Sequence, residues 1–297
     1  MNATAWIEPP RTEPQAWYCD VVWGGNRLAL ESFTMPGLEG RLLSVPSDYR
    51  DEGGDLYHVT VCDRGVFSKF LLLDVAGHGA AAARISKRLQ QPLAELMTEL
   101  DNTAILDTLN HRILEREANG NFATVAAATY NHWDSSWTYA YAGHPCMLVR
   151  RNGCWQALPE CHAGPPVGIL GDSRYYQNEL RLDDGDWLFL FSDGVLDIHN
   201  GDGRRLGYEG LTELVNQAED NDIDDFYRRL ITRLVALNGG ERFTDDLTLI
   251  LLKRKTGTQT LPERTLAAGR RLLMRWMKRN SRHCRIDLPG TQEQVPA

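Results

Sequence analysis

Acidic residues stand at the ends of several very apolar segments of this chain. Asp74 closes the run LLLD and is followed by the glycine-flanked histidine His78. Four further carboxylates border apolar segments in the same way: Asp55, Asp193, Asp245 and Asp246. Carboxylates that converge at strand ends repel one another unless a cation lies between them, and Mg²⁺ and Mn²⁺ prefer such oxygen ligands. The pattern is therefore typical of a two-metal site that activates water toward a phosphoester.

Turn chemistry explains the same residues in a simpler way. Asp and Gly are the commonest residues at strand ends, and one Asp-Gly pair alone indicates only a hairpin. The acidic positions and the Gly-His-Gly sequence, taken by themselves, leave both interpretations open.

The elements that must position these carboxylates are short and apolar or alternating. Strands are expected at 56–62, 69–75, 123–130, 136–142, 146–151, 186–192 and 247–253, with hairpin turns at 132–135 and 151–155. Apolar residues at helical spacing predict helices over 80–100, with a kink or break at Pro92, and over 103–118, 208–218 and 224–237. This order predicts an α+β fold, an antiparallel β-sandwich covered by helices.

The aromatic residues of the 186–192 segment alternate along it. Trp187, Phe189 and Phe191 are therefore expected to point to one side, into the core of the sandwich, rather than to form a substrate-stacking surface.

Composition limits the function classes. The chain has 297 residues and a net charge of −8, which argues against general nucleic-acid binding. It has no apolar run long enough to span a membrane, and its N-terminus lacks the pattern of a secretory signal, so we expect a cytoplasmic protein. The six cysteines include no CxxC pair, and reduced thiols are a better interpretation than a zinc site.

Seven sequence segments occur in the same order as the motifs of a known protein family. They are EGGDLYH at 52–58, LLDVAGHGAAAAR at 72–84, YAYAGHPCMLV at 139–149, GPPVGIL at 164–170, GDWLFLFSDGVLDIHN at 185–200, RLGYEGL at 205–211 and TDDLTLILLKR at 244–254. Over roughly 36–254 the chain resembles the SpoIIE/RsbU-like branch of the metal-dependent PPM (type 2C) serine/threonine protein phosphatases. The resemblance implies an antiparallel sandwich flanked by helix pairs (α-β-β-α layers), with two Mn²⁺ or Mg²⁺ ions at one rim.

The resemblance also implies roles for individual residues. Asp74 would bridge both ions, and Val75 would ligate through its carbonyl. Asp193 and Asp245 would hold one ion, and Asp55 would be a direct or water-mediated ligand. Asp246 would help to position the ligands without contacting the ions itself. His78 is the candidate acid for the leaving oxygen, whereas His144 in AGHP is expected to be structural.

Two positions depart from the family pattern. The usual Tyr-Asp is Tyr57-His58 here, and AGHP runs into Cys146 instead of a second proline. Neither change removes an expected metal ligand, so an altered metal affinity is the expected consequence.

Three regions are expected along the chain: an N-terminal arm at 1–35, a phosphatase domain at 36–255 and a basic C-terminal helix and tail at 256–297. The segment 253–285 carries eleven Lys and Arg against Glu263 alone. Docking of this tail on the protein or on a partner is favoured over contact with a membrane surface. Because the N-terminal arm is short, an activator is expected to be a separate protein, a self-association of the chain, or absent. The resemblance implies that the helix pair at 80–118 is the switch that completes the metal site.

A metal-dependent protein serine/threonine phosphatase is the leading hypothesis. The resemblance implies a phosphorylated regulatory protein as substrate, such as an anti-sigma-factor antagonist in bacterial partner switching. A pseudophosphatase that binds a phosphoprotein and a hydrolase of small phosphoesters remain alternatives, although there is no Walker-type loop.

Overall fold

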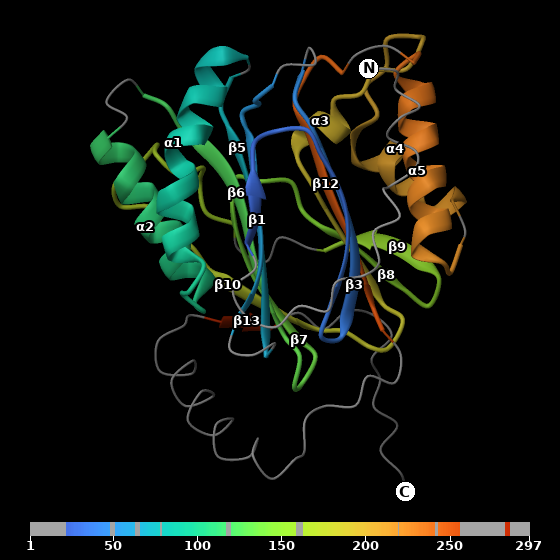
Figure 1. Ribbon diagram of the computed structural model, residues 1–297, viewed down its shortest axis with the longest axis horizontal. Coiled ribbons are helices and arrows are strands. Elements are labelled where there is room, and N and C mark those ends of the chain that lie inside the picture. Colours follow the sequence, from blue (N-terminus) through green and yellow to red (C-terminus); the bar gives the residue numbers. More distant parts are fainter. Residues whose placement is uncertain are drawn as a thin grey trace, which may run out of the picture.

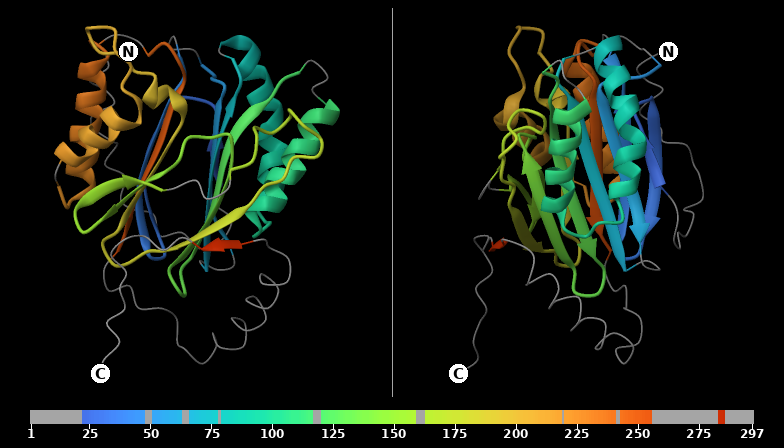
Figure 2. Two further views of the ribbon diagram at one scale, coloured as in Figure 1. Left: turned by 180° about the vertical axis from the view of Figure 1, so that it is seen from behind. Right: turned by 90° about the vertical axis from the view of Figure 1, so that its left-hand side faces the viewer.

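Two β-sheets packed face to face, with helices on both outer faces, make up the protein (Figure 1). The computed structural model describes residues 22–47, 51–62, 66–77, 79–116, 120–158, 163–218, 220–240, 243–255 and 283–285. Among them, one sheet has seven strands in the order β1-β4-β5-β6-β7-β10-β13, and the other has six in the order β2-β3-β12-β11-β8-β9. Helices α1 and α2 cover the first sheet and α4 and α5 the second, as the turned views also show (Figure 2). The α+β sandwich expected from the sequence is confirmed.

The seven-stranded sheet carries the first group of carboxylates. Its strands are β1 (Val22–Gly25), β4 (Asp55–Cys62), β5 (Phe67–Val75), β6 (Ala123–Asn131), β7 (Ser136–Ala142), β10 (Gln177–Arg181) and β13 (His283–Arg285). All neighbours pair antiparallel except β10 and β13, which pair parallel. Its outer helices are α1 (Ala80–Leu96) and α2 (Asn102–Arg116). The helix α1 continues through Pro92, so the predicted break is absent.

The six-stranded sheet carries the second group. Its strands are β2 (Ala29–Met35), β3 (Leu38–Val45), β8 (Leu148–Arg151), β9 (Cys154–Ala157), β11 (Trp187–Phe191) and β12 (Leu247–Arg254). The short α3 (Asp193–Leu196) follows β11 directly, and α4 (Gly207–Gln217) and α5 (Ile223–Leu237) lie outside this sheet. Strands β4, β5, β6, β7, β8, β11 and β12 were expected from the sequence, as were α1, α2, α4 and α5.

Two strands lie where the sequence suggested an arm. Residues 22–25 and 29–35 form β1 and β2, which pair with β4 and β3. These residues are therefore part of the sheets. The basic C-terminal helix and tail expected at 256–297 lie outside the described residues except for 283–285, which form β13. No helix of the described residues is both long and apolar enough to cross a membrane.

Three separate cores hold the layers together. One lies between the two sheets, one under α1 and α2, and one under α4 and α5. The aromatic side chains of Trp187, Phe189 and Phe191 are buried, as expected for core residues, and they belong to the core under α4 and α5. Because β11 is covered on both faces, all five of its residues are buried, and alternation alone could not tell which face is which.

Candidate functional site

One rim of the sandwich brings Asp55 and Asp74 together. Strand β4 begins at Asp55, and β5 ends one residue after Asp74. The antiparallel register of the two strands places Asp55 directly opposite Asp74, so both side chains project from the same face of the sheet. Asp55 is buried, whereas Asp74 is only partly buried.

The other sheet delivers its acidic residues to the same rim. Asp193 follows β11 at the start of α3, and Asp245 and Asp246 come directly before β12, the antiparallel neighbour of β11. The backbones meet closely here, because a Cβ added to Gly194 would lie 2.0 Å from the carbonyl oxygen of Asp246. A residue with a side chain cannot replace Gly194 without displacing one of these segments.

Ser192 connects the two sheets at this rim. Its hydroxyl donates to Asp55 Oδ2 over 2.7 Å and accepts from the backbone N–H of Thr248 over 2.9 Å. Ser192, Asp55 and Thr248 are all buried, so both bonds are made away from solvent. Ser192 was not predicted from the sequence to belong to the site. The signal was its position between an apolar strand and Asp193.

The Asp246 carboxylate faces the protein backbone. Its two oxygens accept hydrogen bonds of 2.5 Å from the N–H groups of Ser47 and Gly54. Gly53 is tightly fitted here as well, since an added Cβ would lie 2.8 Å from Asp246 Oδ1. Asp246 therefore ties the turn before β4 to the end of β3, which agrees with the supporting role expected for it.

Burial, together with repulsion between neighbouring carboxylates, raises the pKa values of Asp55, Asp74 and Asp193. Burial first, and then the negative charges of Asp55, Asp193, Asp245 and Asp246, raises the pKa of Asp74 well above its usual value. Burial also raises the pKa of Asp55, with further contributions from Asp246 and Asp193. The pKa of Asp193 is raised by burial and by Asp245, although a hydrogen bond with Asp74 opposes this. Four expected ligands thus interact as one group of like charges.

The Val75 carbonyl lies at the same rim. Its oxygen is 3.5 Å from the position that a Cβ on Gly54 would occupy, and Val75 pairs with Ala123 at the end of the sheet. The structure therefore brings Asp55, Asp74, Val75, Asp193 and Asp245 into one region. His78 lies outside the described residues.

The two other histidines noted in the sequence are buried. His144 Nδ1 lies 2.8 Å from the hydroxyl of Thr124, and burial lowers the pKa of His144 to about 3. His58 fits against Gly24, where an added Cβ would lie 2.6 Å from the imidazole ring. Burial lowers the pKa of His58 to about 4. Both rings are neutral near pH 7, which suits structural roles.

The donor set fits a hard divalent cation in its chemistry. It consists of carboxylate oxygens and one carbonyl oxygen. A cation would offset both the burial and the mutual repulsion that raise the pKa values of Asp55, Asp74 and Asp193. In the part of the chain that the structure describes, no three His, Cys, Asp or Glu side chains are arranged closely enough to ligate one ion in this conformation.

Comparison with known proteins assigns the chain to a family. Residues 68–255, more than half of the chain, match the family described as Stage II sporulation protein E (SpoIIE). The chain belongs to the SpoIIE family. The match includes Asp74, Val75, Asp193 and Asp245, and it begins after Asp55.

Relatives of this SpoIIE-family chain include a curated phosphatase and solved structures. "Phosphoserine phosphatase RsbU" of Bacillus subtilis (strain 168) is 28% identical over 72% of this chain and 62% of its own length. The PP2C phosphatase domain of SpoIIE from Bacillus subtilis, solved with a fragment of its regulatory domain, superposes with a TM-score of 0.64 at 15% identity, over 77% of this chain and 71% of that one. RsbX in complex with magnesium superposes with a TM-score of 0.55 at 14% identity, over 76% of this chain and all of that one. The chain thus has the PPM fold and spans about three fifths of the length of RsbU.

Proposed function

We propose that this protein is a metal-dependent protein serine/threonine phosphatase. The observation that carries the proposal is the meeting of both sheets at one rim, where Asp55 and Asp74 from one sheet face Asp193, Asp245 and Asp246 from the other. Membership of the SpoIIE family and the similarity to a named phosphoserine phosphatase support the same function.

The residues of the rim divide into ligands and supports. Asp55, Asp74, Asp193, Asp245 and the Val75 carbonyl are the groups that would hold two Mn²⁺ or Mg²⁺ ions. When bound, the ions would polarise the phosphoryl oxygens and lower the pKa of water. RsbX, which shares the fold, was solved with magnesium, which fits a hard-cation site.

The protein's own groups orient this set. Ser192 holds Oδ2 of Asp55 by hydrogen bonding, and the Gly54 and Ser47 N–H groups hold Asp246. His78 remains a prediction as the group that protonates the leaving serine or threonine oxygen.

The proposed substrate is a phosphorylated regulatory protein of a partner-switching pathway. This rests on RsbU and on the second relative "Phosphoserine phosphatase RsbP" of Bacillus subtilis, which is 25% identical over 68% of this chain and 49% of its own length. The proposed substrate is therefore a phosphomonoester of serine or threonine, which is also the bond that the proposed mechanism hydrolyses.

Hydrolysis of an aryl phosphate by the purified protein, with and without Mn²⁺, tests the proposal. Asp193→Asn should abolish turnover because it removes one anionic ligand. Asp197→Asn is the matched control: Asp197 ends the same short helix and pairs with Arg205. We expect this control to retain Mn²⁺-dependent turnover.

Two results would contradict the proposal. Turnover that needs no divalent cation and survives Asp193→Asn would exclude the two-metal mechanism. Absence of turnover on aryl phosphate and on phosphoserine peptides, with phosphopeptide binding retained, would instead establish a binding module.

A further inference from the structure

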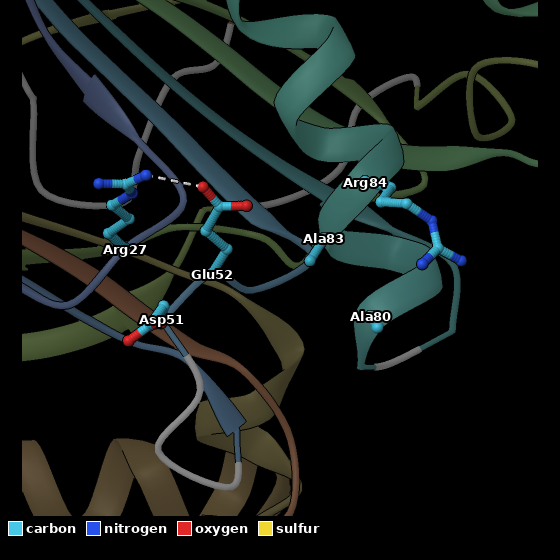
Figure 3. Close-up of a pocket in the computed structure, with 6 residues that line it drawn as sticks. All are labelled: Arg27, Asp51, Glu52, Ala80, Ala83 and Arg84. Carbon is cyan, nitrogen blue, oxygen red and sulfur yellow. Dashed lines mark hydrogen bonds and ion pairs between the residues drawn. The ribbon is translucent and has the colours of Figure 1, made fainter.

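A cavity of about 400 Å³ lies beside the acidic rim, between the β1–β2 turn and the first turns of α1. It is lined by Arg27, Asp51, Glu52, Ala80, Ala83 and Arg84 (Figure 3). Its volume is at the lower end of the range for small-ligand pockets, roughly 300–1,000 Å³, and is enough for one or two side chains of a bound peptide.

Hydrogen bonds hold the walls of this cavity in place. The buried Asn26 side chain donates to the carbonyl oxygens of Gly53 and Ala83, over 3.1 and 3.3 Å. Gln90 of α1 donates to Asn26 Oδ1 over 2.9 Å. The β1–β2 turn, the segment before β4 and the start of α1 are thus joined through one residue, so the cavity is preformed.

The cavity and the acidic rim share the same short segment of chain. Glu52 lines the cavity and Asp55 begins β4, so at most about 11 Å of extended chain separates them. Between them, Gly54 donates to Asp246, and its Cα faces Ala82 of α1 so closely that an added Cβ would lie 3.0 Å from the Ala82 Cβ. A peptide with its phosphoserine at the rim therefore passes close to the cavity.

The cavity lining carries two cations, Arg27 and Arg84, and two anions, Asp51 and Glu52, and Lys87 of α1 adds a third positive charge beside it. Glu52 accepts hydrogen bonds from Arg27 over 2.8 Å and from Lys87 over 2.7 Å, so its charge is already balanced. Arg84 is exposed, projects from the start of α1 away from the Arg27–Glu52 pair, and forms no ion pair with any described residue (Figure 3). With Asp51 included, one positive charge remains unbalanced around the cavity, in a chain whose net charge is −8.

We propose that this cavity is a specificity subsite that binds an acidic side chain of the substrate, within about three residues of the phosphorylated one. Arg84 provides the available guanidinium group, which can hold a carboxylate through two parallel hydrogen bonds. The inference rests on the proposed phosphatase function and names the kind of sequence that the enzyme selects.

The test compares three substrates with Mn²⁺ present: an aryl phosphate, a phosphoserine peptide flanked by Glu, and the same peptide with Gln in place of each Glu. Arg84→Gln should lower kcat/KM for the Glu peptide by about fivefold and leave the other two substrates unchanged. Arg84→Glu should lower it further and should favour a Lys-flanked peptide. Arg88→Gln, one turn further along α1 and also exposed, is the charge-matched control.

Each outcome decides between alternatives. Equal activity of the wild-type protein on Glu and Gln peptides, unchanged in Arg84→Gln, would overturn the subsite while leaving the phosphatase function intact. A loss on the aryl phosphate as well would place Arg84 on the reacting phosphoryl group, which also overturns the subsite. If the protein hydrolyses none of the three substrates, the proposed phosphatase function is wrong. Fluorescence anisotropy with the same peptides then still measures whether binding prefers Glu and whether that preference depends on Arg84.

Discussion

Replacing Ser192 with alanine tests how the rim is organised. The substitution removes the hydroxyl that donates to Asp55 Oδ2 over 2.7 Å and leaves the buried Thr248 N–H without its acceptor. A hydrogen bond to a carboxylate contributes about 1.5–3 kcal/mol, and an unsatisfied buried N–H costs about 1–3 kcal/mol. Because the two effects overlap at one site, we expect the free energy of unfolding to fall by about 2–4 kcal/mol.

The larger effect is expected on metal binding. Loss of a group that orients a metal ligand typically lowers metal affinity by roughly 10- to 100-fold. Titration calorimetry with Mn²⁺, on protein shown by circular dichroism to be folded, measures this directly. Urea unfolding without added metal measures the stability change separately.

Ser136→Ala is the matched control. The Ser136 hydroxyl donates to Asp134 Oδ1 over the same 2.7 Å, but it lies in the β6–β7 hairpin, at the opposite end of β7 from the rim. This variant should lose some stability and keep its Mn²⁺ affinity. An Mn²⁺ affinity of Ser192→Ala equal to that of the wild type would refute the idea that Ser192 orients a metal-binding Asp55.

Three further predictions concern stability. Burial lowers the pKa of Lys69 to about 8 from its usual 10.5. Between these two pH values the unfolded state binds more protons than the folded state, so the free energy of unfolding should rise with pH from about 8 to 10.5. Lys69→Met should remove this rise and stabilise the protein at pH 7 by about 3 kcal/mol, measured by urea unfolding at pH 7 and 10. Gly194→Ala should lower stability by about 3 kcal/mol or more because of its contact with Asp246, whereas Gly201→Ala, with no atom near its added Cβ, should leave the melting temperature almost unchanged. Asp222→Ala should cost about 1 kcal/mol in urea unfolding, since Asp222 caps α5 by accepting two backbone N–H groups; no loss would show that water replaces the cap.

Local patterns predicted the strands and helices that are most regular. Strand β5, with its run of apolar residues, and the helices α1 and α5, with apolar residues at helical spacing, were found within a few residues of their bounds. The β8–β9 hairpin was also predictable, because Asn152 and Gly153 adopt the positive φ that a tight turn requires. These features depend on residues close together in sequence.

Strand β3 shows why other elements were missed. It contains Gly40, Arg41 and Ser44, which do not resemble a buried strand, yet it lies inside the six-stranded sheet, between β2 and β12. Arg41 is tolerated because it pairs with Asp224 of α5, at 2.5 Å and 183 residues away. Gly40 is required because the Phe33 ring packs on it, 2.3 Å from the position of an added Cβ. Neither partner can be recognised from the local sequence.

For the candidate site, the sequence by itself determined which residues could do chemistry: the carboxylates at strand ends and their order along the chain. It could not determine their surroundings. The tertiary structure alone decided that Asp55 stands opposite Asp74, that Ser192 joins the two sheets, and that Arg84 borders a cavity beside the rim. The physical reason is that residue type is local, whereas register, burial and charge repulsion arise only when segments pack against each other, and some of these segments, such as those of Asp55 and Ser192, are more than a hundred residues apart.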